Sequence, residues 1–127
     1  MPEFERTTTV PASPDDAFRV LADPRNLPRY VATMTTSEPT GADRLHVAAD
    51  VEGRHEEGDA RFRADREQRR MEWGGESSRG YRGWIQVAGA GDGASVTIHL
   101  FVEHTGDEEE INRVLDESVG NIRRLLS

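Results

Sequence analysis

Three side chains, Glu56, Tyr81 and Ser118, are the candidates for chemistry in this 127-residue chain. An unpaired carboxylate that faces an apolar cavity has a raised pKa and can donate or accept a proton, and a hydroxyl can position a substrate carbonyl. Each residue also has a structural alternative. A buried tyrosine usually donates to a nearby carbonyl, a helical serine often bonds its own backbone, and Glu56 is ordinary surface if Gly53 or Gly58 shifts the strand. We therefore assign no catalytic residue and keep these three as candidates.

The sequence lacks residue types and patterns that several other chemistries require. The chain has no cysteine, which excludes disulfides, thiolate metal sites and cysteine nucleophiles. It has no lysine, which excludes a lysine Schiff base and argues against a Walker-type phosphate loop. The histidines form no helical metal-binding pair, so we expect no metal and no cofactor; they are His46, His55, His99 and His104.

Charge and length limit the partners. The formal net charge is −8, which repels phosphate backbones and anionic membrane surfaces, so we expect no nucleic-acid partner and no membrane partner. No run approaches the roughly 20 apolar residues of a membrane span, and the first residues do not resemble a signal peptide. We expect a cytoplasmic protein with one domain over residues 1–127.

The N-terminal part of the sequence predicts one short strand followed by two short helical segments. Residues Phe4–Val10 alternate as a strand, and Ser13-Pro14 has the chemistry of a helix start, with a capping serine before a proline. That helix must end near Ala22, because Asp23-Pro24 follows and begins a second short turn. The second turn carries Tyr30 inward.

A meander of strands is expected from Val31 to Glu103, where the apolar period is two. A two-residue turn at Asp92-Gly93 would set Trp84 opposite Phe101 and Gly83 opposite Val102. A turn at Glu67-Gln68 would set Phe62 opposite Trp73 and Ala64 opposite Met71. The outward Trp84–Phe101 pair is either a cross-strand aromatic contact or the centre of a homodimer patch.

One long amphipathic helix, from about Asp107 to Leu126, completes the chain. Its apolar residues recur at spacings of three and four. An acidic run, residues 107–110, lies at the start of this helix. We interpret these carboxylates as partners of the free N–H groups and of the helix dipole there, rather than as metal ligands.

The order of elements resembles the START-like superfamily, the SRPBCC group that includes Bet v 1 relatives and polyketide cyclase/dehydrase-like proteins. The residues that carry the resemblance are Val10-Pro11-Ala12-Ser13-Pro14-Asp15-Asp16-Ala17-Phe18, Leu21-Ala22-Asp23-Pro24 and Leu27-Pro28-Arg29-Tyr30. Members commonly carry V-x-A-S-P and then L-x-D-P-x-x-L-P-x-W, and Tyr30 stands here in place of the tryptophan. The strand phrase Arg69-Arg70-Met71-Glu72-Trp73 also looks like the family's strand after an acidic turn.

The resemblance implies an α+β helix-grip fold. In it, a curved antiparallel sheet wraps around the long C-terminal helix, two short helices follow the first strand, and an apolar cavity lies between sheet and helix. Small inward residues such as Ala60, Ala64 and Gly83 favour such a cavity, whereas closer approach of the helix is the alternative. We expect these residues to line a ligand site: Tyr30, Phe62, Met71, Trp73, Tyr81, Gly83, Ile85, Leu100, Val114 and Ser118.

The function expected from this pattern is binding of a hydrophobic or aromatic small molecule, including lipids, without chemistry. Two alternatives stay open: a polyketide cyclase or dehydratase-like enzyme, and a protein-interaction module of the chaperone-stimulating type. A monomer and a homodimer are both compatible with the sequence.

Overall fold

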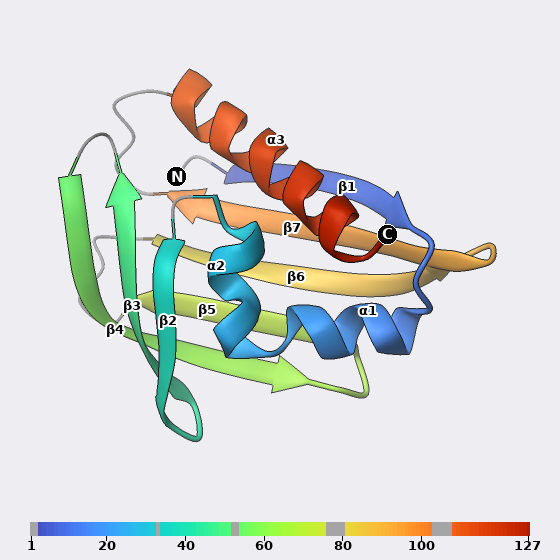
Figure 1. Ribbon diagram of the computed structural model, residues 1–127, viewed down its shortest axis with the longest axis horizontal. Helices are drawn as coiled ribbons and strands as arrows, with labels where there is room; N and C mark the ends of the chain where they lie inside the picture. Colours follow the sequence, from blue (N-terminus) through green and yellow to red (C-terminus); the bar gives the residue numbers. More distant parts are fainter. Residues whose placement is uncertain (1–2, 33, 52–53, 76–80, 103–107) are drawn as a thin grey trace.

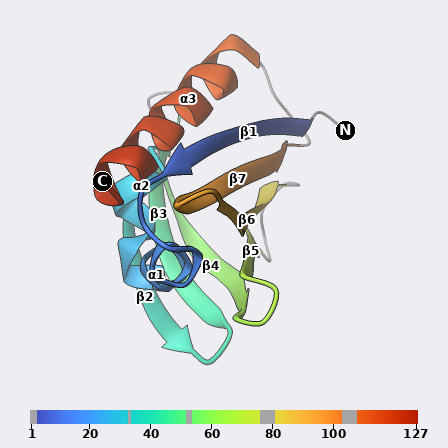
Figure 2. The ribbon, with the colours of Figure 1, turned by 90° about the vertical axis from the view of Figure 1, so that its right-hand side faces the viewer.

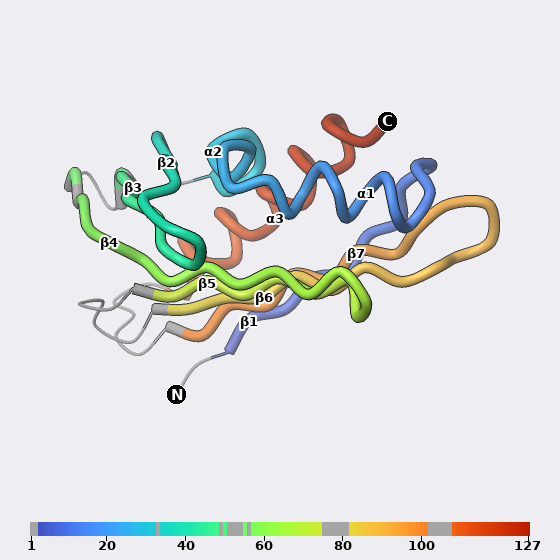
Figure 3. Tube along the Cα trace, turned by 90° about the horizontal axis from the view of Figure 1, so that it is seen from below, coloured from blue at the N-terminus to red at the C-terminus, as the bar shows by residue number. Residues whose placement is uncertain are grey.

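One antiparallel sheet carries all the helices on one of its faces (Figure 3). The computed structural model describes residues 3–32, 34–51, 54–75, 81–102 and 108–127. The elements are β1 (Glu3–Val10), α1 (Pro14–Leu21), η1 (Pro24–Asn26), α2 (Leu27–Tyr30), β2 (Met34–Gly41), β3 (Arg44–Val51), β4 (Arg54–Asp65), β5 (Arg70–Gly75), β6 (Tyr81–Ala90), β7 (Gly93–Val102) and α3 (Glu108–Leu125). This order confirms the expected α+β helix-grip fold.

The described strands form a seven-stranded sheet in the order β1-β7-β6-β5-β4-β3-β2. Helix α3 crosses the sheet over β1 and β7, while β2 and β3 turn away from the other strands at the far end (Figure 1). Seen from the side, the sheet is curved, with α3 and β1 at one edge and β2 at the other (Figure 2). No helix in the described ranges is long and apolar enough to cross a membrane.

The helix starts expected from the sequence are confirmed. The Ser13 hydroxyl accepts a hydrogen bond from the Asp16 backbone N–H at 3.2 Å, and α1 begins at Pro14. The Asp23 carboxylate accepts from the Arg25 N–H at 3.0 Å, and η1 begins at Pro24. Each cap satisfies an N–H that the helix itself leaves unpaired.

The β4–β5 hairpin has the predicted register. Phe62 pairs with Trp73, and Ala64 pairs with Met71. Asp65 holds the turn, because its carboxylate accepts from the N–H groups of two turn residues at 3.0 and 3.2 Å. Ala64 is nevertheless exposed, so the expectation that it lies inside is wrong: this end of β4 extends beyond the core.

The β6–β7 hairpin is shifted by two residues from the predicted register. Ala90 pairs with Gly93, so the turn is Gly91-Asp92 and not Asp92-Gly93. Gly91 has φ 57°, which suits the first turn position of a type II′ hairpin. Gly93 instead begins β7 beside the end of β1, where an added Cβ would overlap the carbonyl oxygen of Val10. A shift of two changes partners but keeps each side chain on its predicted face.

The corrected register changes the aromatic contact on the outer face, the one opposite the helices. Trp84 faces His99 rather than Phe101, and their rings stack with centroids 5.0 Å apart. Phe101 contacts the other side of His99 at 4.6 Å. The guanidinium groups of Arg70 and Arg82 lie over the rings of Trp84 and Phe101, at 4.3 and 4.7 Å from the centroids. These outward aromatic residues therefore have partners within one chain.

Two histidines share one carboxylate on the outer face of β3 and β4. His46 Nε2 lies 3.1 Å from Glu57, and His55 Nε2 lies 3.1 Å from the other oxygen of the same carboxylate. The remaining ring nitrogens contact Asp59 at 3.3 Å and Asp50 at 2.9 Å. No group of three or more possible ligands within the described ranges is arranged to hold a metal ion.

This cluster changes the charge equilibria of its members. Hydrogen bonds to Glu57 and Asp59 raise the pKa of His46, and those to Asp50 and Glu57 raise the pKa of His55. Hydrogen bonds from both histidines lower the pKa of Glu57. The histidine contribution to stability is full below their ordinary pKa of 6.5 and is lost as pH rises through the raised values. The Glu57 contribution is full above its ordinary pKa of 4.5 and is lost as pH falls through the lowered value.

We expect Glu57→Gln to lower the thermal midpoint most between pH 4.5 and 6.5, where both contributions are present. The difference from wild type should shrink under strongly acidic conditions and again under alkaline conditions. Thermal unfolding followed by circular dichroism over this pH range measures it. Glu67→Gln, which removes a carboxylate from the β4–β5 turn, is the control and should show no such maximum. A pH-independent difference for Glu57→Gln would contradict the interpretation.

Candidate functional site

The inner face of the sheet, which lies beneath the helices, contains most of the predicted ligand-binding residues. One row crosses five strands, because Phe62, Trp73, Gly83, Leu100 and Phe4 are successive partners on β4, β5, β6, β7 and β1. Paired residues share a face, so this row is continuous beneath the helices. The predicted ligand-binding residues with described side chains are buried, except the half-buried Val114; they are Tyr30, Phe62, Met71, Trp73, Gly83, Ile85, Leu100 and Ser118.

Gly83 does not open the void that its size suggested. A Cβ built on Gly83 would lie 2.6 Å from Cζ2 and 2.9 Å from Cε2 of Trp73. The indole of Trp73 therefore lies over the glycine backbone and occupies the space that a side chain at position 83 would need. Gly83 also pairs with Leu100 rather than with Val102. At this point of the sheet, the small residue provides room for a large neighbour.

Two buried polar atoms on the inner face have no hydrogen-bond partner in the described part of the chain. They are Nε1 of Trp73 and the hydroxyl of Ser37, and both residues are 5% exposed. Ser37 pairs with Val47, whose side chain packs against the core. Most buried polar groups in proteins are paired, so such atoms call for an explanation, and a bound molecule or water is one.

Ser37 was not among the residues singled out from the sequence. The register between β2 and β3 shifts between Met34 and Thr36. A bulge of this kind breaks the alternation of faces, so the pattern of β2 does not reveal that Ser37 is buried. Two neighbouring positions of β2, Thr36 and Glu38, are exposed.

Tyr30 has a structural role. It is fully buried, its hydroxyl donates a hydrogen bond to the Leu21 carbonyl oxygen at 2.6 Å, and it contacts Met71 Sδ at 3.7 Å. Burial raises the pKa of Tyr30, so the residue stays neutral. This hydroxyl connects α2 to the end of α1 and lies against the sheet.

Ser118 connects α3 to the chain that follows α2. Its hydroxyl oxygen accepts a hydrogen bond from the Ala32 N–H at 3.0 Å, so it bonds a distant backbone group and not its own helix. Asn121, three residues along α3, donates to the Tyr30 carbonyl oxygen at 3.4 Å. This bond uses one acceptor position of the hydroxyl and gives Ser118 a structural role.

The other two catalytic candidates cannot be placed in the same way. Glu56 pairs with Ala49 and Tyr81 pairs with Val102 along the backbone. The side chains of Glu56 and Tyr81 lie outside the described part of the structure. Their roles remain predictions from the sequence.

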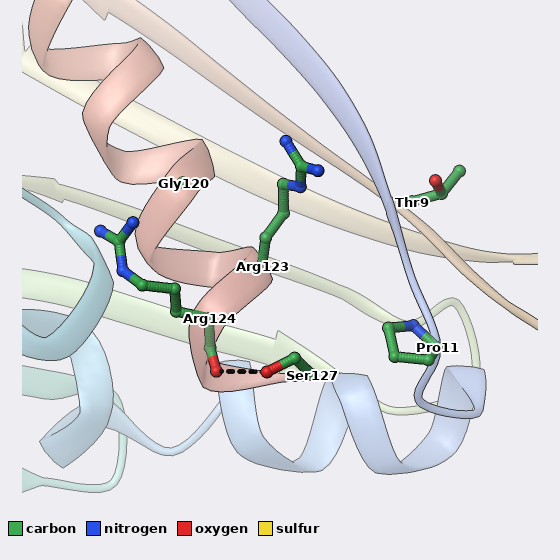
Figure 4. Close-up of a pocket in the computed structure, with 6 residues that line it drawn as sticks. All are labelled: Thr9, Pro11, Gly120, Arg123, Arg124 and Ser127. Atoms are coloured by element: carbon green, nitrogen blue, oxygen red, sulfur yellow. Dashed lines mark hydrogen bonds between the residues drawn. The ribbon is translucent and has the colours of Figure 1, made fainter.

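A separate pocket of about 370 Å³ lies at the end of α3, beside the end of β1. Its lining contains none of the predicted ligand-binding residues; it is made by Thr9, Pro11, Gly120, Arg123, Arg124 and Ser127. The guanidinium groups of Arg123 and Arg124 point in different directions (Figure 4), and the Ser127 hydroxyl donates to the Arg124 carbonyl oxygen at 3.0 Å. Because the two cations do not converge, this pocket is a weaker candidate than the inner face.

Comparison with known proteins identifies a family. The sequence model of the family described as polyketide cyclase / dehydrase and lipid transport matches residues 1–126. No curated protein sequence matches the chain.

Solved structures share the fold at low sequence identity. A Deinococcus radiodurans protein has a TM-score of 0.78 at 16% identity, over 97% of this chain and 95% of its own. A START superfamily protein from Mycobacterium smegmatis has a TM-score of 0.74 at 11% identity, over 96% and 92%. The di-domain ARO/CYC protein StfQ from the steffimycin biosynthetic pathway has a TM-score of 0.73 at 21% identity, over 97% of this chain and 44% of its own.

We expect Gly83→Ala to destabilise the protein by about 1–3 kcal/mol, because the added methyl group must displace the Trp73 ring. Gly89→Ala, on the same strand, is the matched control. A Cβ there meets only Pro14 Cγ, at 3.8 Å, so this change should be neutral or slightly stabilising. Urea unfolding measures both free energies. Equal effects of the two changes would contradict the packing described for Trp73.

Ser118→Ala should cost about 1–3 kcal/mol of stability, because it leaves the part-buried Ala32 N–H without its acceptor. Ser118→Thr keeps the oxygen and is the variant that separates the hydrogen bond from packing. Urea unfolding, with hydrogen exchange at the Ala32 amide, tests the assignment. Unchanged exchange at Ala32 in Ser118→Ala would contradict it.

Proposed function

Because the chain belongs to the polyketide cyclase/dehydrase and lipid transport family, we propose that it binds an apolar or aromatic small molecule between the inner face of the sheet and α3. Family membership agrees with the START-like resemblance of the sequence. It does not name a reaction, because one fold hosts many functions. The function must therefore be argued from the site.

The observation that carries the proposal is a pair of buried polar atoms that find no partner among the described residues and lie within an apolar surface. The row from Phe62 to Phe4 offers aromatic and aliphatic side chains, and the two polar atoms are the N–H of Trp73 and the hydroxyl of Ser37. Sites for small molecules combine a mostly apolar lining with a few polar groups that orient the ligand. The inner face has both components.

Binding is favoured over catalysis by the state of the candidate groups. A cyclase needs an acid or base in reach of its substrate. Among the three candidates, Ser118 accepts a structural hydrogen bond, and the described part of the inner face offers no carboxylate in its place. Formation of a new product from an aromatic polyketide-like substrate, and its loss in Glu56→Gln or Tyr81→Phe, would establish the enzyme instead.

The proposed binding is tested with acetylnaphthalene and ethylnaphthalene as probes. The chain has two tryptophans, so Trp84→Phe leaves Trp73 on the inner face as the sole indole. We expect at least one probe to change the emission of this variant in a saturable way, with no new compound in the mixture. Titration of tryptophan fluorescence, with mass spectrometry of the recovered probe, measures both.

The matched control is Trp73→Phe, which retains only the outer-face Trp84. Its emission should not change in a saturable way with either probe. Equal responses from the two single-tryptophan variants would contradict binding at the inner face, and so would the absence of any response.

A further inference from the structure

The indole N–H of Trp73 is a donor that meets no acceptor in the part of the chain that the structure describes. An indole nitrogen can only donate, and its single hydrogen needs one oxygen or similar acceptor. Nε1 is buried, Trp73 is 5% exposed, and no acceptor lies within hydrogen-bond distance in the described residues. The other fully buried polar aromatic residue, Tyr30, has its hydroxyl paired with a carbonyl oxygen. Of these two buried polar aromatic residues, only Trp73 lacks a hydrogen-bond partner within the described residues.

The position of the indole is set by the sheet. Its Cε2 and Cζ2 atoms lie above Gly83. Because Nε1 is bonded to Cε2, the N–H group lies close to the same part of the inner face. The row neighbours of Trp73 and Gly83 are Phe62 and Leu100, whose side chains contain no acceptor. Backbone groups of the central strands are used in the ladder on both sides of β5 and β6. Within the described residues no group supplies an acceptor for this N–H, and a bound molecule is one source of it.

We propose that Trp73 is a specificity residue, whose N–H donates a hydrogen bond to an acceptor oxygen, such as a ketone or phenol oxygen, on the ligand of the inner face. The inference rests on the proposed binding function and narrows its ligand class. An apolar ligand without an acceptor leaves the donor buried and unpaired, whereas a ligand with an oxygen at this point pairs it. The site therefore selects oxygenated aromatic molecules over hydrocarbons of the same shape.

The same two probes test this selection. Acetylnaphthalene has a ketone oxygen, and ethylnaphthalene has similar size without an acceptor. One neutral hydrogen bond changes affinity by about three- to tenfold. We expect the preference for acetylnaphthalene over ethylnaphthalene to be smaller by that factor in Trp73→Phe than in Trp84→Phe. Comparing the two variants removes the difference in hydrophobicity between the probes. Isothermal titration calorimetry measures all four affinities.

A second measurement uses the unchanged protein, in case Trp73→Phe does not fold. Nitrogen-15 spectra contain one indole signal for each of the two tryptophans, and Trp84→Phe assigns them. Acetylnaphthalene should move the Trp73 N–H proton downfield, as hydrogen bonding does, while ethylnaphthalene should not. The Trp84 signal should stay in place with both probes.

The outcomes separate this inference from the function on which it rests. Binding of both probes with an unchanged preference, or without the downfield shift, overturns the role of Trp73 and leaves the binding function in place. Failure of both probes to bind overturns the binding function itself. A reduced preference in Trp73→Phe, together with the downfield shift, supports both.

Discussion

The packing of the Trp73 indole against Gly83 is the contact on which the arrangement of the inner face depends. A side chain at position 83 would occupy the space of the ring, since even a Cβ would come within 2.6 Å of it. With glycine there, β5 and β6 keep their ladder while the largest side chain of the row occupies the space above Gly83. Phe62 and Leu100 are the row neighbours of Trp73 and Gly83, so the apolar surface continues from β4 to β7. This packing also fixes the position of the indole N–H. It therefore determines which polar contact a molecule on this face can make.

The helices are attached to that surface by a few directed hydrogen bonds in addition to apolar packing. Tyr30 reaches from α2 to the Leu21 carbonyl, Ser118 reaches from α3 to Ala32, and Asn121 reaches back to Tyr30. Each bond satisfies a polar group that burial would otherwise leave unpaired. The residues that sequence analysis grouped as a ligand site thus divide into two kinds. Some hold the helices in place over the sheet, and others form the inner face of the sheet beneath the helices.

Much of the fold followed from local sequence chemistry. The caps at Ser13 and Asp23 and the β4–β5 register were predictable, because each depends on residues close together in the chain. The β6–β7 turn was misplaced by one residue, which shifts the cross-strand partners by two, because the run from Gly89 to Gly93 offers turn chemistry at more than one position. A side chain at position 93 would overlap the carbonyl oxygen of Val10, a long-range contact that the local turn chemistry does not reveal. The roles of Gly83 and Ser37 were hidden for the same reason: one depends on a neighbouring ring, and the other on a bulge in β2.

The sheet order also has a consequence for how the chain reaches its native state. β1 is the first strand in the sequence, yet its partner along the sheet is β7, the last. Phe4 completes the central row only when Leu100 is in place, and the closing contact spans nearly the whole chain. Such long-range pairing slows folding, because a large loop must close before the contact repays the lost entropy. During synthesis, β1 must wait unpaired until β7 has emerged, and the region that α3 covers is the last to be assembled.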